Sequence, residues 1–152
     1  MSGIVYAIEK LQQWRRDAEP FLHDHWREMS PNPNVQLDPD WAMYDRLETV
    51  GGLVIYTARI DGELIGYAFF MGGRSHPHYK TMKWMINDNI RINPDYRRKG
   101  IGTGLLDFAE EDLKRRGVDY IQIHAKTKHP ELAKMLESRK YISDEQIYTR
   151  RL

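Results

Sequence analysis

Apolar side chains recur at helical spacing in four parts of the chain, and each part is predicted to form a helix. These parts are residues 9–29, residues 39–50, residues 101–116 and a shorter stretch that opens at His129–Pro130. Pro20 is expected to break or kink the first part into one or two helices, and Asp38 supplies an N-cap for the second. The predicted helices therefore lie in the first and last thirds of the chain.

Runs of β-forming residues occupy the middle of the chain and its end. Residues 53–60 and 63–71 are joined by Asp61–Gly62, a dipeptide that favours a two-residue type I′ hairpin turn. A loop is expected over 72–80, followed by strands over about 82–92, 120–123 and 144–150. A run of strands followed by one strand–loop–helix–strand unit predicts an α/β (α+β) fold with a mixed sheet and helices on both faces.

Length, charge and cysteine content restrict the class of protein. The chain has 152 residues, which suits a single domain over residues 1–152. Charged residues make up 30% with a net charge of +1, so no overall field favours nucleic acid or membrane. Because the chain has no cysteine, it cannot form a disulfide, a thiolate metal site or a cysteine nucleophile. No apolar run approaches the ~20 residues of a membrane helix, and we expect a soluble cytoplasmic protein.

A basic, glycine-rich turn precedes the third predicted helix. Residues 97–104 read Arg-Arg-Lys-Gly-Ile-Gly-Thr-Gly, and the glycines at 100 and 102 let backbone N–H groups approach an anion at the positive end of the helix. A nucleotide P-loop is disfavoured, because leucines follow Gly104 where lysine and a hydroxyl residue are needed. A dinucleotide fingerprint is disfavoured too, because the third glycine comes one residue early. The turn therefore predicts another kind of phosphate site.

The spacing R-x-x-G-x-G from Arg97 to Gly102, after the strand-like residues 89–96, resembles the pyrophosphate loop of the GNAT superfamily of N-acetyltransferases. The resemblance extends from about Leu53 to the C-terminus, and residues 37–41 and 76–79 look like a variant common in bacteriophage genomes. It implies a GNAT fold with a mostly antiparallel, twisted sheet. It also implies an acyltransferase that moves acetyl from acetyl-CoA directly to a primary amine, with no covalent enzyme intermediate.

The same resemblance implies which residues bind acetyl-CoA. The pyrophosphate is expected on the loop, the thioester and pantetheine on the strand before it, and His129 stands where the family often has a CoA-contacting asparagine. The expected residues are Ile90, Arg91, Ile92, Arg97, Arg98, Lys99, Gly100, Ile101, Gly102, Thr103 and His129. A basic turn that binds no ligand is the alternative interpretation of the loop.

Asp88 is the candidate general base. By alternation along its strand it shares a face with Ile86, Ile90 and Ile92, so its carboxylate is expected on an otherwise apolar face. A carboxylate buried there costs free energy unless it is paired or takes up a proton, and a general base exploits such a setting. The alternatives are a structural hydrogen bond or a bulge that turns Asp88 to solvent.

The acid that protonates the departing thiolate is where the sequence departs from the family. Members often carry a tyrosine in the short helix after the fifth strand, but alignment on Ala133 puts Leu136 at that position. Tyr141, which follows Lys140 rather than the usual glycine, is one candidate acid, and Tyr148, Tyr79 or water are others. These changes affect the acid step and not the fold.

The expected loop at residues 72–80 contains His76, His78 and Tyr79, in a region where substrate commonly enters in this fold. His78 is predicted to relay the amine proton, because imidazole titrates near neutrality, while His76 and Tyr79 are predicted to contact the acceptor. Two histidines at this spacing without a third ligand make a poor metal signature, so no metal is expected.

A second group of expected acceptor contacts surrounds Trp41 and Tyr44. Together with Asp40 and Asp45 they form a predicted aromatic, acidic wall that suits a cationic amine. The sequence does not identify that amine, which a small molecule, a protein or a nucleotide would each supply.

Two other interpretations remain open at this point. A non-catalytic CoA-binding or interaction module is favoured by the missing tyrosine and asparagine, and nucleic-acid binding through residues 114–116 and 126–128 is a third hypothesis. Nucleic acid is not the expected partner, because alternating charges usually only solvate helices. A homodimer through the β-rich residues 141–150 is open as well, since last strands often mediate dimers in the superfamily.

Overall fold

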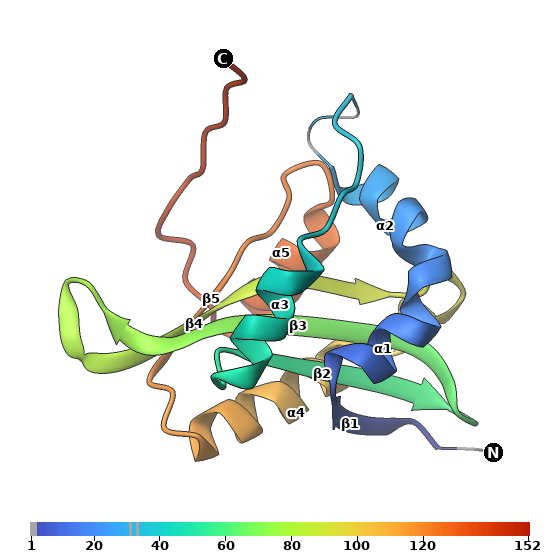
Figure 1. The fold of residues 1–152 in the computed structure, drawn as a ribbon, viewed down its shortest axis with the longest axis horizontal. Coiled ribbons are helices and arrows are strands. Elements are labelled where there is room, and N and C mark those ends of the chain that lie inside the picture. Colours follow the sequence, from blue (N-terminus) through green and yellow to red (C-terminus); the bar gives the residue numbers. More distant parts are fainter. Residues whose placement is uncertain (1–2, 31, 33) are drawn as a thin grey trace.

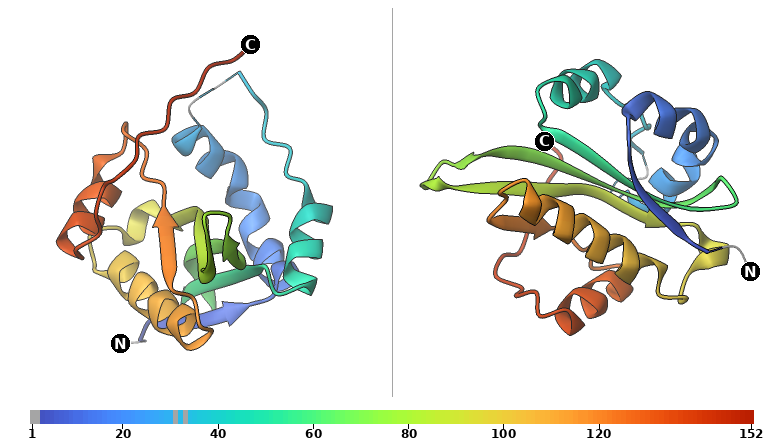
Figure 2. Two further views of the ribbon diagram at one scale, coloured as in Figure 1. Left: turned by 90° about the vertical axis from the view of Figure 1, so that its left-hand side faces the viewer. Right: turned by 90° about the horizontal axis from the view of Figure 1, so that it is seen from below.

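A sheet of five strands lies between two layers of helices. The structure is a computed structural model that describes residues 3–30, 32 and 34–152. The strands follow the order β1-β2-β3-β4-β5, and neighbours are antiparallel except for the parallel pair β4 and β5. Helices α1, α2 and α3 cover one face, and α4 and α5 cover the other (Figure 1, Figure 2). The expected mixed, mostly antiparallel sheet with helices on both faces is therefore confirmed.

The bounds of the elements show how helices and strands alternate. The strands are β1 (Val5–Glu9), β2 (Leu53–Ile60), β3 (Glu63–His76), β4 (Tyr79–Ile92) and β5 (Tyr120–Ile123). The helices are α1 (Leu11–Ala18), α2 (Leu22–Met29), α3 (Trp41–Thr49), α4 (Ile101–Arg115) and α5 (Pro130–Ser138), with short 3-10 segments η1 (Glu19–Phe21) and η2 (Pro94–Tyr96). None of the helices in the described ranges is long and apolar enough to cross a membrane.

The first strand is absent from the sequence prediction. β1 pairs antiparallel with β2, and the buried Glu9 carboxylate at its end accepts hydrogen bonds from Arg59 at 2.6 and 2.9 Å. Both contacts join residues about fifty positions apart, so the local spacing of residues 9–29 did not reveal them. The helical region that follows divides at Pro20 into α1, η1 and α2, as predicted.

The two hairpins of the sheet differ in how well the sequence predicted them. Asp61 and Gly62 have φ angles of 51° and 84°, as a type I′ turn requires, and this hairpin is confirmed. The loop expected over 72–80 is wrong, because β3 continues to His76 and β4 begins at Tyr79. Register shifts let the pairing continue through irregular residues, and the two strands form a long arm that projects from one side of the molecule (Figure 1).

Two further boundaries are decided by hydrogen bonds. Asp40, rather than Asp38, caps α3, since its side chain accepts from the backbone N–H of Met43 at 2.9 Å. The closing strand expected over 144–150 is wrong: these residues form no strand and run away from the body of the protein with exposed side chains (Figure 1). Extended residues make a strand only where a neighbour satisfies their N–H and C=O groups, and no described strand lies alongside them.

Apolar side chains fill both interfaces between the sheet and the helices. Phe69 and Phe70 are adjacent on β3 and point to opposite faces, so Phe69 packs with Trp14 of α1 and Phe70 with the α4 side. The polar exception on the buried stripe of α4 is Asp112, which accepts a hydrogen bond from the buried Tyr56 hydroxyl at 2.8 Å. The sheet is thereby held rigidly between its two helical layers.

Candidate functional site

The turn before α4 has the geometry of an anion site. Gly100 is the N-cap residue with a φ of 76°, and Arg98 also has a positive φ, of 60°. The N–H of Gly104 bonds to the carbonyl of Gly100 at 3.0 Å, so the N–H groups of residues 101–103 precede the first intrahelical bond. Together with the helix dipole, these N–H groups can hold a phosphate.

The three cations of the turn have different contacts. Arg97 makes an ion pair with Glu28 of α2 at 2.7 Å, and Lys99 donates to the carbonyl of Asp95 at 3.1 Å. Arg98 is exposed and makes no ion pair with any residue in the described ranges. Arg98 is therefore the cation of the turn most available to an anionic ligand.

The strand before the turn separates from its neighbour halfway along. β4 pairs with β5 only from Trp84 to Asn87, although β4 itself continues to Ile92. On the β5 side, the backbone of residues 88–92 therefore has no strand partner in the part of the chain that the structure describes. This open edge of β4 leads through η2 directly to the turn before α4. A ligand that carries amide groups can pair with it.

A β-bulge marks the point where β4 and β5 separate. Asn87 and Asn89 pair with two successive residues of β3, so Asp88 between them is the extra residue. The bulge reverses the alternation, so Ile90 and Ile92 pack on the α4 side, whereas Asp88 faces α3. The expectation that Asp88 shares a face with Ile90 and Ile92 is wrong, and its carboxylate is exposed rather than buried.

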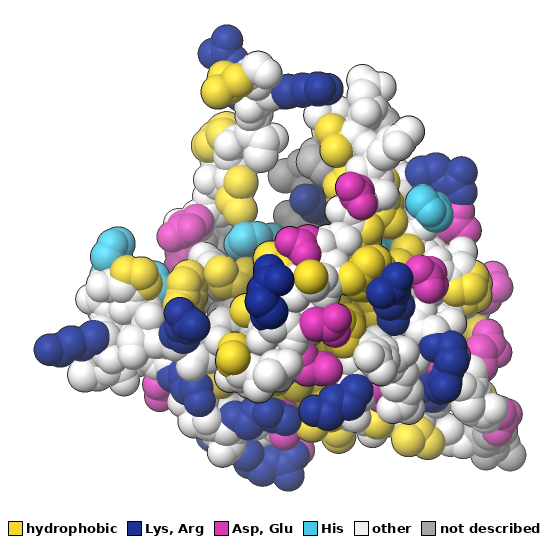
Figure 3. All heavy atoms as spheres, viewed as in Figure 1, with side chains coloured by type: hydrophobic (Ala, Val, Ile, Leu, Met, Phe, Trp, Pro, Cys, Tyr) yellow, Lys and Arg dark blue, Asp and Glu magenta, His cyan; other side chains and the backbone are white. Residues whose placement is uncertain are grey.

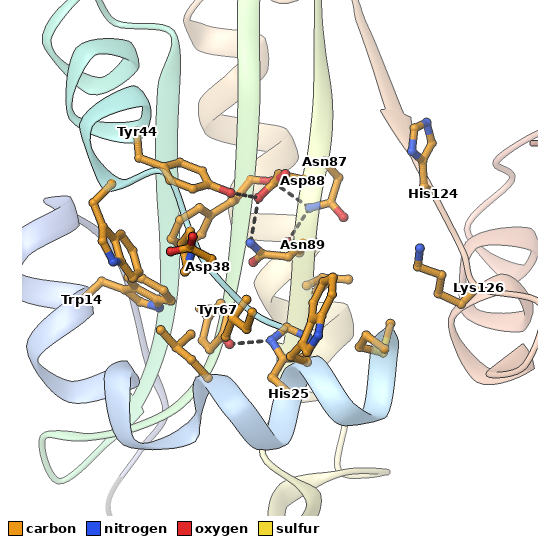
Figure 4. A pocket seen from close by; sticks show the side chains of 18 of the residues that line it. Trp14, His25, Asp38, Tyr44, Tyr67, Asn87, Asp88, Asn89, His124 and Lys126 are labelled. Atoms are coloured by element: carbon orange, nitrogen blue, oxygen red, sulfur yellow. Dashed lines mark hydrogen bonds between the residues drawn. The ribbon is translucent and has the colours of Figure 1, made fainter. Parts of the chain in front are cut away.

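A cavity of about 490 Å³ lies on the face of the sheet that α1, α2 and α3 cover (Figure 4). Its aromatic lining consists of Trp14, Trp26, Trp41, Tyr44, Tyr67 and Phe69. On the far side, Ile90, His124 and Lys126 line it at the gap between β4 and β5. Figure 3 shows hydrophobic side chains reaching the surface between α1 and α3. The cavity thus joins an aromatic pocket to the open edge of β4.

Two carboxylates line the cavity and lie near the Tyr44 ring (Figure 4). Asp38 precedes α3, and Asp88 accepts hydrogen bonds from the Tyr44 hydroxyl at 2.8 Å and from Asn89 Nδ2 at 2.9 Å. Burial, together with the charge and hydrogen bond of Asp88, raises the pKa of Tyr44, so the phenol stays protonated and keeps donating. The remaining lone pairs of Asp88 can bind an ammonium group and accept its proton. In the described ranges, His, Asp and Glu side chains form no group of three that would hold a metal ion.

A half-buried imidazole and a buried phenol form another wall of the cavity (Figure 4). His25 Nδ1 of α2 and the Tyr67 hydroxyl of β3 lie 2.7 Å apart. Burial and the positive charges of Arg91 and Arg97 lower the pKa of His25 to about 4, while burial raises the pKa of Tyr67 to about 12. Both groups are therefore uncharged at neutral pH.

The structure brings together only some of the residues that the sequence singled out. Asp88, Ile90, Trp41 and Tyr44 all line the cavity. His76, His78 and Tyr79 instead pack against one another at the tip of the β3–β4 arm, outside the cavity lining (Figure 1). The extension of both strands through the expected loop carries these rings away from the site.

Three other predicted side chains are engaged in structural contacts. Tyr141 donates to Glu110 of α4 at 2.5 Å, and His129 Nε2 bonds to the carbonyl oxygen of Glu28 at 2.7 Å. Arg91 donates to a carbonyl of η1 at 3.0 Å, which turns its guanidinium away from the α4 turn. Only the backbone of Arg91 therefore belongs to the open edge of β4.

The cavity also contains residues that the sequence prediction missed. Asp38 takes the place expected for Asp40 and Asp45, which lie outside the lining, and Asn89 positions the Asp88 carboxylate. His25 is a further omission. The sequence did contain one signal, because an acid flanked by two asparagines at residues 87–89 stands between the apolar residues Ile86 and Ile90. Asp38 and His25 line the same cavity as that acid only because distant segments pack on the sheet.

Comparison of the sequence and the fold with known proteins identifies the family of the chain. The sequence profile of the acetyltransferase (GNAT) family matches residues 8–139. Curated protein sequences gave no match. Among solved structures, the ribosomal-protein-alanine N-acetyltransferase from Brucella melitensis biovar Abortus 2308 is similar with a TM-score of 0.75 and 21% identity, over 99% of each chain.

Two other solved structures are similar over almost the whole chain. Aminoglycoside acetyltransferase AAC(6')-Iy, in complex with the bisubstrate analogue CoA-S-monomethyl-acetylneamine, has a TM-score of 0.71 and 14% identity over 99% of each chain. A transcriptional regulator from Bacillus halodurans C-125 has a TM-score of 0.77 and 14% identity, over 99% of this chain and 100% of that one. Identities this low show a shared fold and not a shared substrate. Since the family profile covers most of its length, the chain belongs to the acetyltransferase (GNAT) family.

Proposed function

We propose that the protein transfers the acetyl group of acetyl-CoA to a primary amine. The observation that carries the proposal is the open edge of β4 at residues 88–92, which lies between the α4 turn and the aromatic cavity. Acetyl-CoA has a pyrophosphate, an amide-containing pantetheine arm and a thioester, and these match the N–H groups of the turn, the open backbone edge and the cavity in that order. The similarity to structures solved with CoA supports the same assignment.

The residues present supply the steps of direct transfer. The amine nitrogen loses a proton to Asp88, directly or through water, and attacks the thioester carbonyl, so a C–N bond forms and the C–S bond breaks. Tyr44 and Asn89 hold the Asp88 carboxylate in place for this proton transfer. Backbone N–H groups of the open β4 edge stabilise the oxyanion, and solvent returns a proton to the departing thiolate.

A matched pair of glycine substitutions tests donor binding. Gly100 and Gly117 lie at opposite ends of α4 with φ angles of 76° and 78°, and a Cβ atom at either would meet no neighbour within 4 Å. Alanine at either position should therefore cost a similar stability, about 1 kcal/mol. Only Gly100→Ala should disturb the N–H groups of the turn, weakening acetyl-CoA binding in calorimetric titration by about tenfold or more.

Two results would overturn the proposal. One is the absence of acetyl-CoA binding by the folded wild-type protein, and the other is equal weakening of acetyl-CoA binding by Gly100→Ala and Gly117→Ala. ATP and NAD serve as ligand controls, because each carries phosphates but lacks the pantetheine arm.

A non-catalytic CoA-binding module is the second candidate. It is favoured by Leu136, which is buried in the core at the position where the family often has a tyrosine that acts as the general acid. A thiol reagent that detects released CoA distinguishes the two candidates, and the protein itself gives no background signal because the chain has no cysteine. Acetyl-CoA binding with no CoA released in the presence of any amine would identify the binding module.

We also propose that the C-terminal residues pair with a second copy of the chain. Ile147 and Tyr148 are 63% and 87% exposed although both favour β-structure, and β5 has a single strand neighbour among the described residues. Light scattering on the full chain and on a chain ending at Ser143, which keeps the contact of Tyr141 with Glu110, tests this. Dimer for the first and monomer for the second is the expected result, and a monomeric full chain would contradict it.

A further inference from the structure

The aromatic side chains of the cavity form one interlocking wall. The ring centroid of Trp14 lies 4.5 Å from that of Phe69 and 6.3 Å from that of Trp41, and Trp41 lies 6.2 Å from Tyr44. The guanidinium of Arg15 stacks 4.1 Å above the Trp41 ring and helps to fix its orientation. Rings that are already held in place bind a flat apolar group with little loss of side-chain entropy.

The charges in the cavity are few and nearly balanced. Among the described lining residues, Asp38 and Asp88 are the carboxylates and Lys126 is the ammonium side chain. His25 adds no charge at neutral pH, because burial lowers its pKa to about 4. Two carboxylates suit a single ammonium group. A ligand with several positive charges would leave some of them unpaired in a largely aromatic cavity, where desolvated charge is costly.

The size of the cavity and the segments that border it favour a small acceptor. Lys128 Nζ donates to the carbonyl of Ser30 at 2.7 Å, and His129 bonds to the carbonyl of Glu28 at 2.7 Å. These two bonds tie the connection between β5 and α5 to the end of α2, and Lys126 and Met29 from these two segments border the cavity. Its volume of about 490 Å³ must also receive the thioester end of the donor, which leaves room for a small molecule.

We propose that the acceptor is a small arylalkylamine, in which one primary ammonium group is joined by a short alkyl linker to an aromatic ring. The ring packs against Trp41 and Tyr44, which are half-buried and line the cavity, and the ammonium group binds Asp38 and Asp88 (Figure 4). The buried Trp14 and Phe69 support these two rings from behind. This arrangement puts the amine nitrogen beside the bulge of β4, where the thioester would lie. The inference rests on the acetyl-transfer function proposed above, and it specifies the substrate class.

A panel of amines tests the assignment on the wild-type chain. Release of CoA is followed with phenethylamine, propylamine, spermidine, kanamycin and a short peptide with a free N-terminus. Phenethylamine is expected to have a kcat/KM at least tenfold above those of spermidine, kanamycin and the peptide. Binding of phenethylamine in the presence of CoA is measured separately by tryptophan fluorescence, which does not depend on turnover, with 2-phenylethanol as the uncharged control.

Substitutions in the cavity separate recognition of the ring from recognition of the charge. Trp41→Ala should lower kcat/KM for phenethylamine more than tenfold and for propylamine less than threefold, whereas Asp38→Asn should lower both. Phe21→Ala and Asp24→Asn are the matched controls, since Phe21 is an exposed ring outside the cavity and Asp24 pairs with Arg27 on the surface of α2. A general loss of folding would lower kcat/KM for both amines by the same factor, so the ratio of the kcat/KM values for phenethylamine and propylamine reports the contact with the ring.

The outcomes distinguish failure of this inference from failure of the proposed function. A folded protein that does not bind acetyl-CoA overturns the acetyl-transfer function itself. A protein that binds acetyl-CoA but neither binds nor acetylates phenethylamine, or that prefers spermidine, kanamycin or the peptide, overturns only the arylalkylamine assignment. Equal losses for phenethylamine and propylamine in Trp41→Ala would also overturn it.

Discussion

Replacing Gly104 by alanine separates packing from ligand binding in the glycine-rich turn. A Cβ atom on Gly104 would lie 2.6 Å from Cζ of Tyr6 and closer still to the Tyr6 hydroxyl. Tyr6 lies on β1, its ring stacks on Phe108 of α4 at a centroid distance of 6.3 Å, and its hydroxyl donates to the carbonyl of Ile101 at 3.4 Å. The glycine therefore allows β1 to approach the first turn of α4 closely.

Two opposing terms set the size of the effect. Glycine to alanine inside a helix stabilises it by about 0.5–1 kcal/mol, whereas a methyl group forced into a packed contact costs about 1–3 kcal/mol. The contact dominates at this distance, so Gly104→Ala should lower the free energy of unfolding by about 1–2 kcal/mol and Tm by about 2–8 °C. The affinity for acetyl-CoA should not change, because the N–H of Gly104 is already bonded to Gly100 at 3.0 Å.

The assay is urea unfolding of the wild type, Gly104→Ala, Tyr6→Ala and the double variant. In the Tyr6→Ala background the contact is absent, so alanine at position 104 should instead raise the free energy of unfolding by about 0.5–1 kcal/mol. A change of sign between the two backgrounds is the expected result. The reasoning is refuted if Gly104→Ala stabilises the wild type, or if it costs the same free energy in both backgrounds.

Three other predictions concern charge. The pKa of His25 falls from an ordinary 6.5 to about 4 on folding, so the unfolded chain takes up a proton at His25 before the folded chain does as pH falls. The free energy of unfolding should therefore drop by about 2 kcal/mol between pH 7.5 and pH 5. Urea unfolding of His25→Gln should show a much smaller drop, and the same pH dependence in wild type and variant would contradict this. Arg59→Met leaves the buried Glu9 carboxylate without its cationic partner and should lower the free energy of unfolding by about 3–5 kcal/mol. The double variant with Glu9→Leu should restore most of that loss. A loss within error of zero in Arg59→Met would disprove the stabilising role of this pair. Asp88→Asn should lower kcat by about 100-fold or more while calorimetry shows unchanged acetyl-CoA affinity, and unchanged turnover would remove Asp88 from the mechanism.

The sequence predicted those elements that depend on neighbouring residues. The Asp61–Gly62 turn, the start of α4 after Gly100 and the start of α5 at Pro130 lie where the sequence indicated, because turn residues, caps and prolines act through local backbone geometry. The prediction failed at β1, at the β3–β4 arm and over residues 144–150. Strands form only by pairing with distant parts of the chain, so their ends are not encoded locally.

In the candidate site, too, the parts made of contiguous residues were predicted better than the parts that distant segments bring together. The proposed donor side could be predicted from a continuous segment, since the turn at 97–103 and the strand before it are contiguous in sequence and their N–H groups follow from the backbone alone. Among the residues that line the cavity, the sequence singled out Trp41, Tyr44, Asp88 and Ile90 as site residues. The expected contact of His76, His78 and Tyr79 with the acceptor is not supported, because β3 and β4 extend through residues 72–80 and place these rings outside the cavity lining.

What the sequence determined by itself was the family, the glycine-rich turn at the start of α4 and the presence of a carboxylate at position 88. Only the tertiary structure decided which way that carboxylate points, because one bulged residue reverses the alternation of β4. Tertiary packing also brought Asp38 and His25 into the lining of the same cavity from segments 50 and 63 residues away from Asp88 in the chain. Side chains so far apart meet through the packing of helices on a sheet, which no local pattern of residues specifies.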